Sequence, residues 1–146
     1  MPSKTVFDLV VTDMPPPSLR DELGGGISAF NVARLGPADM RPLAILIQSQ
    51  HDRATIGGLL GRTSFRRLFI ELLFVPESLR GQGVGRDLLQ KAEVEAKSRG
   101  CLGGWLETFS ADAHRFYEAN GYRTFGEIAD YPPGNTRYFL SKAWEG

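Results

Sequence analysis

The chain has 146 residues, a formal net charge of zero at neutral pH and 42% apolar residues. This length and apolar content predict a single domain, residues 1–146, with a full hydrophobic core. The neutral charge argues against a nucleic-acid-binding protein, which usually carries a basic surplus. A lone Cys101 cannot form an internal disulfide, and the sequence shows neither a signal-peptide pattern nor a membrane-spanning apolar run. We therefore expect a cytoplasmic protein.

The N-terminal part of the chain predicts a strand, a weak helix and a loop. Apolar residues between Thr5 and Thr12 favour a strand. Ser18 is typical of a helix N-cap, and apolar residues follow it at helical spacing. Gly24-Gly25-Gly26 interrupts this stripe at about 1 kcal/mol per glycine, so we expect a weak or broken helix. Residues 31–42, which contain Gly36, Pro37 and Pro42, indicate a loop.

Three apolar runs follow and predict an antiparallel meander. Leu43–Gln50 and Ala54–Thr63 are joined by a short polar segment and read as a hairpin. A second polar turn leads into a strand over Leu68–Val75, which Pro76 ends. Alternation along this strand predicts one face made of Phe69, Glu71, Leu73 and Val75.

Glu71 is unusual because it lies in the middle of an apolar strand. A carboxylate there must have a partner, reach water or hold a proton. It is a candidate general base, and the alternatives are a pair with Arg66 or Arg67, or exposure at a cleft edge. Glu107, on the strand predicted over residues 101–109, is a second candidate base by the same reasoning. The sequence leaves open whether Glu71, Glu107 or a water molecule takes the proton.

The segment from Val75 to Arg86 leads from this strand through glycines into a helix that starts at about Gly83. Glycines before a helix allow backbone N–H groups to point together at an anion, which the helix dipole also attracts. Arg80 and Arg86 add positive charge. The spacing matches neither a P-loop nor a dinucleotide fingerprint. The alternative is a turn that only joins strand to helix.

The remaining elements are regular. The helix after the loop has an apolar face, and Asp87–Lys91 and Glu93–Lys97 are placed as ion pairs on its exposed side. The strand over residues 101–109 should run parallel to the strand before the helix. Ser110 is placed to cap a helix over Ala111–Asn120. Two further strands are predicted, over Tyr122–Ile128 and Thr136–Ala143.

Two segments carry a resemblance to a known family. Arg80-Gly81-Gln82-Gly83-Val84-Gly85 resembles the Arg/Gln-x-x-Gly-x-Gly/Ala signature of the GCN5-related N-acetyltransferase (GNAT) superfamily. Residues 113–122, with Tyr117 and Gly121-Tyr122, resemble its second signature, Ala-x-x-x-Tyr-x-x-x-Gly-Phe/Tyr. Two motifs in the expected order, separated by a helix and a strand, are far more specific than either alone. The resemblance extends from about Ile45 to Ala143.

The resemblance implies an α/β fold with a mixed, twisted sheet of six or seven strands and helices on both faces. A V-shaped cleft between two parallel central strands would hold acetyl-coenzyme A, and no metal is implied. Backbone groups of Leu73, Phe74 and Val75 would bind the pantetheine arm. Ser110 stands near the point where family members often carry an asparagine that binds this arm. The pyrophosphate would lie on Arg80, Gly81, Gln82, Gly83, Val84, Gly85 and Arg86.

The resemblance also implies an activity. Tyr117 matches the family position whose phenol lies beside the cofactor sulfur and can give a proton to the leaving thiolate. A core tyrosine is the alternative. We expect an N-acetyltransferase that moves an acetyl group to the primary amine of a small molecule by direct attack of the amine on the thioester. Glu71 would be the base and Tyr117 the acid. Tyr131 or Tyr138 could line the acceptor pocket, and a homodimer is implied. The alternatives are a non-catalytic acetyl-coenzyme A sensor and a protein or peptide N-acetyltransferase.

Overall fold

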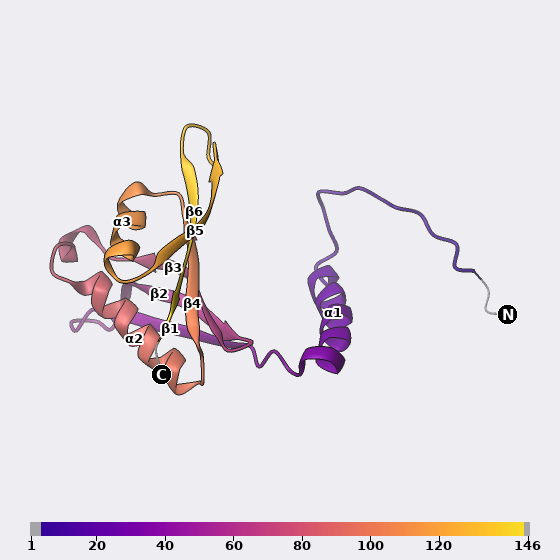
Figure 1. Cartoon of the computed structure of the whole chain (residues 1–146), viewed down its shortest axis with the longest axis horizontal. Helices are drawn as coiled ribbons and strands as arrows, with labels where there is room; N and C mark the ends of the chain where they lie inside the picture. The colour runs from indigo at the N-terminus through magenta and orange to yellow at the C-terminus, as the bar shows by residue number, and fades with distance from the viewer. Residues whose placement is uncertain (1–3, 145–146) are drawn as a thin grey trace. The chain divides into compact units, whose positions relative to one another are not determined.

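The computed structural model describes residues 4–144 and divides the chain into two compact units. The first unit ends at Ala38 and contains one helix, α1 (Leu19–Leu35). The second begins at Asp39 and contains the sheet and the remaining helices (Figure 1). Each unit is described by itself.

The first unit corrects four predictions. Residues 5–12 contain no strand, because a strand needs a hydrogen-bonded neighbour and every strand of the sheet begins after residue 40. α1 is continuous through Gly24-Gly25-Gly26, whose φ angles are not positive, so the helix is not broken at these glycines. The helix also runs beyond Asn31 to Leu35, which confines the predicted loop to residues 36–40. Ser18 occupies the N-cap, but its hydroxyl donates to Glu22 Oε1 and does not cap the backbone.

The second unit is built on one mixed sheet of six strands. They are β1 (Arg41–Gln48), β2 (Thr55–Ser64), β3 (Arg67–Phe74), β4 (Gly103–Thr108), β5 (Arg123–Ala129) and β6 (Thr136–Ala143). Their order across the sheet is β1-β2-β3-β4-β6-β5. β3 and β4 pair in parallel and all other neighbours are antiparallel. The predicted hairpin, meander and parallel central pair are therefore confirmed.

Two helices of this unit lie on the same face of the sheet (Figure 1). α2 (Val84–Ser98) connects β3 to β4, and α3 (Ala111–Ala119) connects β4 to β5. A short 3-10 turn, η1 (Glu77–Leu79), precedes the glycine segment. Ser110 caps α3 as predicted, because its Oγ accepts a hydrogen bond from the Ala113 N–H at 3.2 Å. The predicted mixed α/β fold is confirmed. The predicted helices on both faces are not seen among the described residues of this unit, because the two crossovers run in the same direction across the sheet and place α2 and α3 on one face.

The core lies between this sheet face and the two helices. It is formed by side chains from both layers, namely Leu43, Leu59, Leu68, Ile70, Leu88, Leu89, Ala92, Ala96, Cys101, Leu106, Tyr117, Tyr122 and Leu140. Glu93 also lies here, which corrects the prediction of an exposed Glu93–Lys97 pair. Its carboxylate accepts hydrogen bonds from Tyr122 Oη at 3.0 Å and Lys142 Nζ at 2.9 Å. Asp87 likewise contacts Arg86 Nε, at 4.0 Å, and not Lys91.

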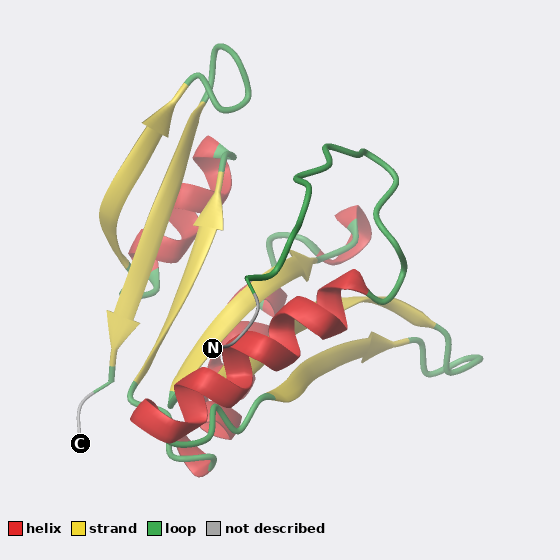
Figure 2. Cartoon of the chain, turned by 90° about the vertical axis from the view of Figure 1, so that its right-hand side faces the viewer, coloured by secondary structure: helices red, strands yellow, loops and turns green. Residues whose placement is uncertain are grey.

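The parallel strands β3 and β4 separate along their length. Their pairing ends at Ile70 and Leu106, although β3 continues to Phe74 and β4 to Thr108. Figure 2 shows the strands diverging from this point. Beyond Ile70, the backbone groups of β3 on the side toward β4 have no strand partner. The geometry opens the middle of the sheet at the carboxyl ends of its parallel strands, where α/β sheets bind ligands.

A β-bulge lies at the same place. The β2–β3 register passes from Gly61 opposite Ile70 to Leu60 opposite Leu72, which leaves Glu71 without a partner residue. The bulge shifts the alternation, so Glu71 and Leu72 are both exposed. The predicted single face of Phe69, Glu71, Leu73 and Val75 is therefore wrong beyond Glu71. The bulge divides these side chains between two pockets, described below.

Candidate functional site

The glycine segment forms the N-terminal end of α2. Gly81 and Gly83 have φ angles of 77° and 79°, in the left-handed region that strongly favours glycine. Gly83 is the N-cap residue, and the amides of the first helical turn after it have no partner inside the helix. These amides and the positive end of the dipole of a 15-residue helix are suited to binding a phosphate group.

A pocket of about 640 Å³ lies beside this helix end, between the C-terminal part of β3 and α3. Most residues predicted to bind acetyl-coenzyme A line it, namely Leu73, Phe74, Val75, Arg80, Gly81, Gly83, Val84, Gly85, Arg86 and Ser110. Gln82 is not among its lining residues, because its side-chain amide donates to the Ser78 carbonyl at 3.3 Å. The strand, the glycine segment and the second helix thus converge on one concave surface.

The two arginines of this pocket have different roles. Arg80 Nε donates to the Val75 carbonyl at 3.0 Å, which ties the glycine segment to the end of β3. Arg86 is exposed and its nearest carboxylate, Asp87, lies 4.0 Å away with both side chains about 60% exposed. An ion pair of this kind contributes little, so the Arg86 guanidinium is available to an anionic ligand.

Tyr117 of α3 borders the same pocket and is 7% exposed. Its ring packs edge-on against Phe116 and Tyr122. Burial raises the pKa of the Tyr117 phenol to about 12, so the group stays protonated at neutral pH. Its hydroxyl makes no hydrogen bond to any residue in 4–144, which leaves it free to donate into the pocket.

A second pocket, of about 510 Å³, also lies at the divergence of β3 and β4. Its lining residues are Arg62, Phe69, Glu71, Leu72, Glu107, Thr108, Phe109, Ser110 and Arg137. Both candidate bases are here. Glu107 pairs with Arg137 Nη1 at 2.9 Å, whereas Glu71 forms no ion pair within the described residues. The alternative pairs with Arg66 or Arg67 are not formed within the described residues, and Arg66 Nε donates to the Gly100 carbonyl instead. The other alternative, exposure of the Glu71 carboxylate, is what the structure shows.

Ser110 lines both pockets. It lies two residues after the end of β4, at the N-cap of α3, so the two spaces adjoin at the open end of the parallel pair. A ligand along β3 and a second ligand near Glu71 can therefore meet there. This arrangement is suited to transfer of a group between two bound molecules.

Several pocket residues were not predicted from the sequence. Phe116 precedes Tyr117 on α3, and its position within the second motif segment is the available signal. Arg62 lies in a glycine-rich strand and carries no motif.

Tyr131 lies against Arg137, with the guanidinium carbon 3.9 Å from the ring centroid. Tyr138 stacks on His114, centroid to centroid at 3.7 Å. Neither tyrosine is among the pocket-lining residues.

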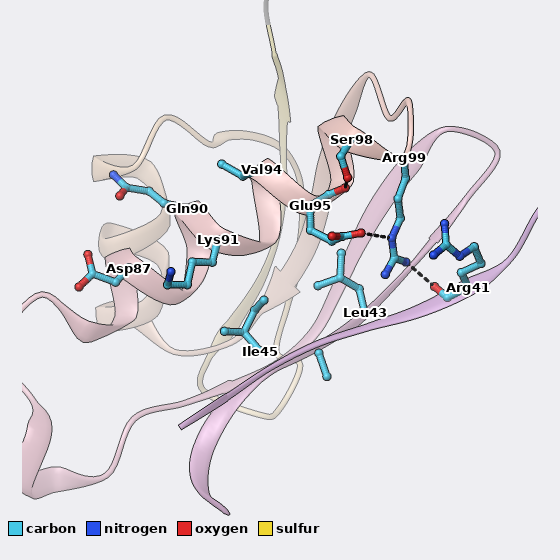
Figure 3. A pocket seen from close by; sticks show the side chains of 11 residues that line it. Arg41, Leu43, Ile45, Asp87, Gln90, Lys91, Val94, Glu95, Ser98 and Arg99 are labelled. Atoms are coloured by element: carbon cyan, nitrogen blue, oxygen red, sulfur yellow. Dashed lines mark hydrogen bonds and ion pairs between the residues drawn. The ribbon is translucent and has the colours of Figure 1, made fainter. Parts of the chain in front are cut away.

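A third, larger groove of about 1090 Å³ separates α2 from β1, at the edge of the sheet (Figure 3). Leu43 and Ile45 of β1 point toward α2, and Lys91, Val94 and Glu95 of α2 are among the other lining residues. Arg99 closes one end, with Nε 2.7 Å from Glu95 Oε2 and Nη1 donating to the Pro42 carbonyl at 3.0 Å. None of the predicted site residues lines this groove, so it is the seam between helix and sheet edge.

Two further findings concern the part of the chain that the structure describes. Residues 4–144 contain no group of three or more histidine, cysteine, aspartate or glutamate side chains that could hold a metal ion. No helix among them has the length and apolar character needed to cross a membrane. Cys101 is buried two residues before β4, and burial raises the pKa of its thiol, as expected for a packed side chain.

Comparison with known proteins identifies the family. Residues 31–122 match the model of the acetyltransferase (GNAT) family. An acetyltransferase of Agrobacterium fabrum is 37% identical over 136 residues, 93% of this chain and 98% of that protein. The blasticidin-S acetyltransferase of Streptomyces morookaense is 41% identical over 87 residues, 59% of this chain and 64% of that protein. A crystal structure from Agrobacterium tumefaciens has a TM-score of 0.89 at 36% identity, covering 94% of this chain and 100% of its own.

The family model covers β3, both motif segments and the helix and strand between the motifs, and it therefore includes all elements that line the first pocket. The Agrobacterium fabrum relative extends the match to nearly the whole chain. The sequence motifs, the fold and the comparisons agree, and the chain belongs to the acetyltransferase (GNAT) family.

Proposed function

We propose that the chain is an N-acetyltransferase that moves an acetyl group from acetyl-coenzyme A to the primary amine of a small molecule. The observation that carries this proposal is the pair of pockets that adjoin at Ser110. One offers helix-end amides and arginine for an anion, and the other offers a free carboxylate for an amine. The similarity to a blasticidin-S acetyltransferase supports an acceptor of small size.

Acetyl-coenzyme A supplies an activated thioester. Each part of this molecule contacts a different set of groups in the first pocket. The amides after Gly83 and the Arg86 guanidinium receive the pyrophosphate. The open backbone edge of β3 beyond Ile70 pairs with the amide groups of the pantetheine arm. The thioester then lies near Tyr117, at the end of the pocket that adjoins the acceptor.

The transfer is a direct attack. The amine nitrogen bonds to the thioester carbonyl carbon, the carbon–sulfur bond breaks, and the thiolate takes the proton of the Tyr117 hydroxyl. Glu71 takes the proton lost by the amine, directly or through water. Glu71 suits this role better than Glu107, because Glu107 is paired with Arg137 and Glu71 is unpaired among residues 4–144.

Steady-state acetyl transfer across a panel of amines tests this proposal. We expect Glu71→Gln and Tyr117→Phe to lower kcat by roughly 10²- to 10⁴-fold, the usual effect of general acid–base groups. Coenzyme A binding, measured by calorimetry, should stay within a few-fold of wild type in both variants. Glu127→Gln, an exposed carboxylate on β5, is the matched control and should keep full activity. Wild-type rates for Glu71→Gln and Tyr117→Phe would remove their assigned roles.

The pH profile provides a further check on Tyr117. Because its pKa lies near 12, the phenol keeps its proton well above pH 10. The wild-type rate should therefore show no alkaline decline caused by Tyr117 below about pH 10. A decline at lower pH that disappears in Tyr117→Phe would mean that this phenol titrates earlier.

If no amine is acetylated although coenzyme A binds, the proposed function fails and a sensor of acetyl-coenzyme A gains support.

A further inference from the structure

The second pocket is lined by four charged side chains, two of each sign. They are Arg62, Arg137, Glu71 and Glu107. Glu107 and Arg137 satisfy each other through an ion pair of 2.9 Å. The pocket therefore presents a ligand with the remaining two charges, one basic and one acidic.

Arg137 is held as part of the wall. Its guanidinium carbon lies 3.9 Å from the Tyr131 ring centroid and 5.0 Å from that of Phe109. Its Nε atom is buried and has no hydrogen-bond partner among the described residues. A buried atom cannot be reached by a ligand without rearrangement of the rings around it. Arg137 is therefore already engaged with Glu107, and its charge is compensated inside the pocket.

Arg62 is in a different situation. It lies opposite Phe69 in the β2–β3 register, and its guanidinium carbon stands 4.6 Å from the Phe69 ring centroid. This cation–π contact fixes the direction of the side chain without neutralising its charge. Within residues 4–144 Arg62 forms no ion pair and no side-chain hydrogen bond. All of its donors remain for a planar anion, which guanidinium binds with two parallel hydrogen bonds.

Glu71 supplies the opposite charge in the same pocket. It is exposed at the bulge of β3 and carries no cationic partner among the described residues. The rest of the lining includes the apolar side chains Phe69, Leu72 and Phe109. A volume of about 510 Å³ is within the range of small-molecule sites.

We propose that the acceptor is a zwitterion, an amine that also carries a carboxylate, with its ammonium group at Glu71 and its carboxylate on Arg62. This inference rests on the proposed acetyl transfer and adds the chemical class of the acceptor. A ligand with both charges compensates both free groups of the pocket. A neutral or purely cationic amine covers Arg62 without giving its guanidinium an anionic partner, which costs binding energy.

The test uses sets of amines that differ only in their second group: a carboxylate, its primary amide, and a phosphonate at the same position. Wild type should acetylate the carboxylate with kcat/KM roughly 10- to 100-fold above the amide, the effect of one charge-assisted contact. Arg62→Gln should remove this preference by lowering only the carboxylate rate, while the amide rate stays within a few-fold. Arg62→Lys keeps the positive charge but not the planar pair of N–H donors, so this variant should retain part of the preference for the carboxylate. Arg123 is an exposed arginine of β5, so Arg123→Gln is the matched control and should behave as wild type.

Three results would overturn the zwitterion proposal. Wild type could acetylate the amide and the carboxylate with equal kcat/KM. The acceptor would then not be recognised as a zwitterion, although the proposed acetyl transfer would stand. Arg62→Gln could keep the preference, which removes Arg62 as the receptor. The phosphonate could be preferred over the carboxylate, which changes the anion. Absence of transfer to any amine is a separate result, because it removes the proposed function and this inference with it.

Discussion

At the scale of single residues, the buried Glu93 shows how a charge inside the core is balanced. Its side chain is 9% exposed and lies between Tyr122 Oη and Lys142 Nζ. Lys142 also donates to the Asn120 carbonyl at 3.0 Å. This cluster connects α2, the end of α3 and β6. Burial, together with the charge of Glu93 and the hydrogen bond to it, raises the pKa of the Tyr122 phenol, so the phenol remains a donor.

We predict that Lys142→Met lowers the free energy of unfolding by about 2–3 kcal/mol, because it leaves the buried Glu93 carboxylate without a cation. The value is placed below that of a fully buried pair since Lys142 is 28% exposed. Urea denaturation followed by tryptophan fluorescence measures the change. Replacing both partners, in Glu93→Met with Lys142→Met, should recover most of the loss. A single variant as stable as wild type would show that the pair contributes nothing.

The sequence indicates unusual residues at this scale more reliably than it indicates their partners. Glu71 was identified because a carboxylate interrupts an apolar strand, and it does line a pocket. Glu93 was missed because it fits an exposed i,i+4 pair with Lys97, and only the fold brings Lys142 to it. Arg62 was missed for the same reason: its cation–π partner Phe69 lies on the neighbouring strand. Local sequence does not contain contacts made across a sheet.

At the scale of elements, the glycine segment was predictable because its signals are local. Pro76 and the following glycines require a break between strand and helix, and the structure places the N-cap at Gly83. The start of the chain behaves differently. A strand over residues 5–12 depends on a neighbour to pair with, and the continuity of α1 depends on the helix as a whole. The β-bulge at Glu71 left no signal in β3 itself.

We predict that Gly83→Ala weakens coenzyme A binding by roughly tenfold. An alanine at φ 79° costs about 1–2 kcal/mol, and its Cβ would lie 3.0 Å from Arg86 Nη2. Both effects displace the amides and the guanidinium assigned to the pyrophosphate. Calorimetric titration with coenzyme A measures the change. Gly126→Ala is the matched control, because its Cβ meets nothing within 4 Å and its φ is not positive. If coenzyme A binding were weakened equally in both variants, the effect would not be specific to Gly83, and the assignment of Gly83 to the pyrophosphate site would be wrong.

At the scale of the sheet-containing unit, the divergence of β3 and β4 organises the site. It opens a backbone edge for one ligand and leads to a second pocket with an unpaired carboxylate. The mixed sheet and the parallel pair followed from the order of strands and helices, so they were predictable from the sequence. The shape of the acceptor pocket was not, because its lining comes from four strands distant in the sequence. The homodimer implied by the family resemblance stays a prediction.

Calorimetric titration of the full chain with coenzyme A tests most directly whether the first pocket is a cofactor site. We predict saturable binding with one site per chain, and affinity that falls as salt is raised, because the pyrophosphate is held by helix-end amides and Arg86. Arg86→Gln should weaken the binding without altering its stoichiometry. Absence of saturable binding at millimolar coenzyme A would contradict the assignment of the glycine segment, and with it the proposed acetyl transfer.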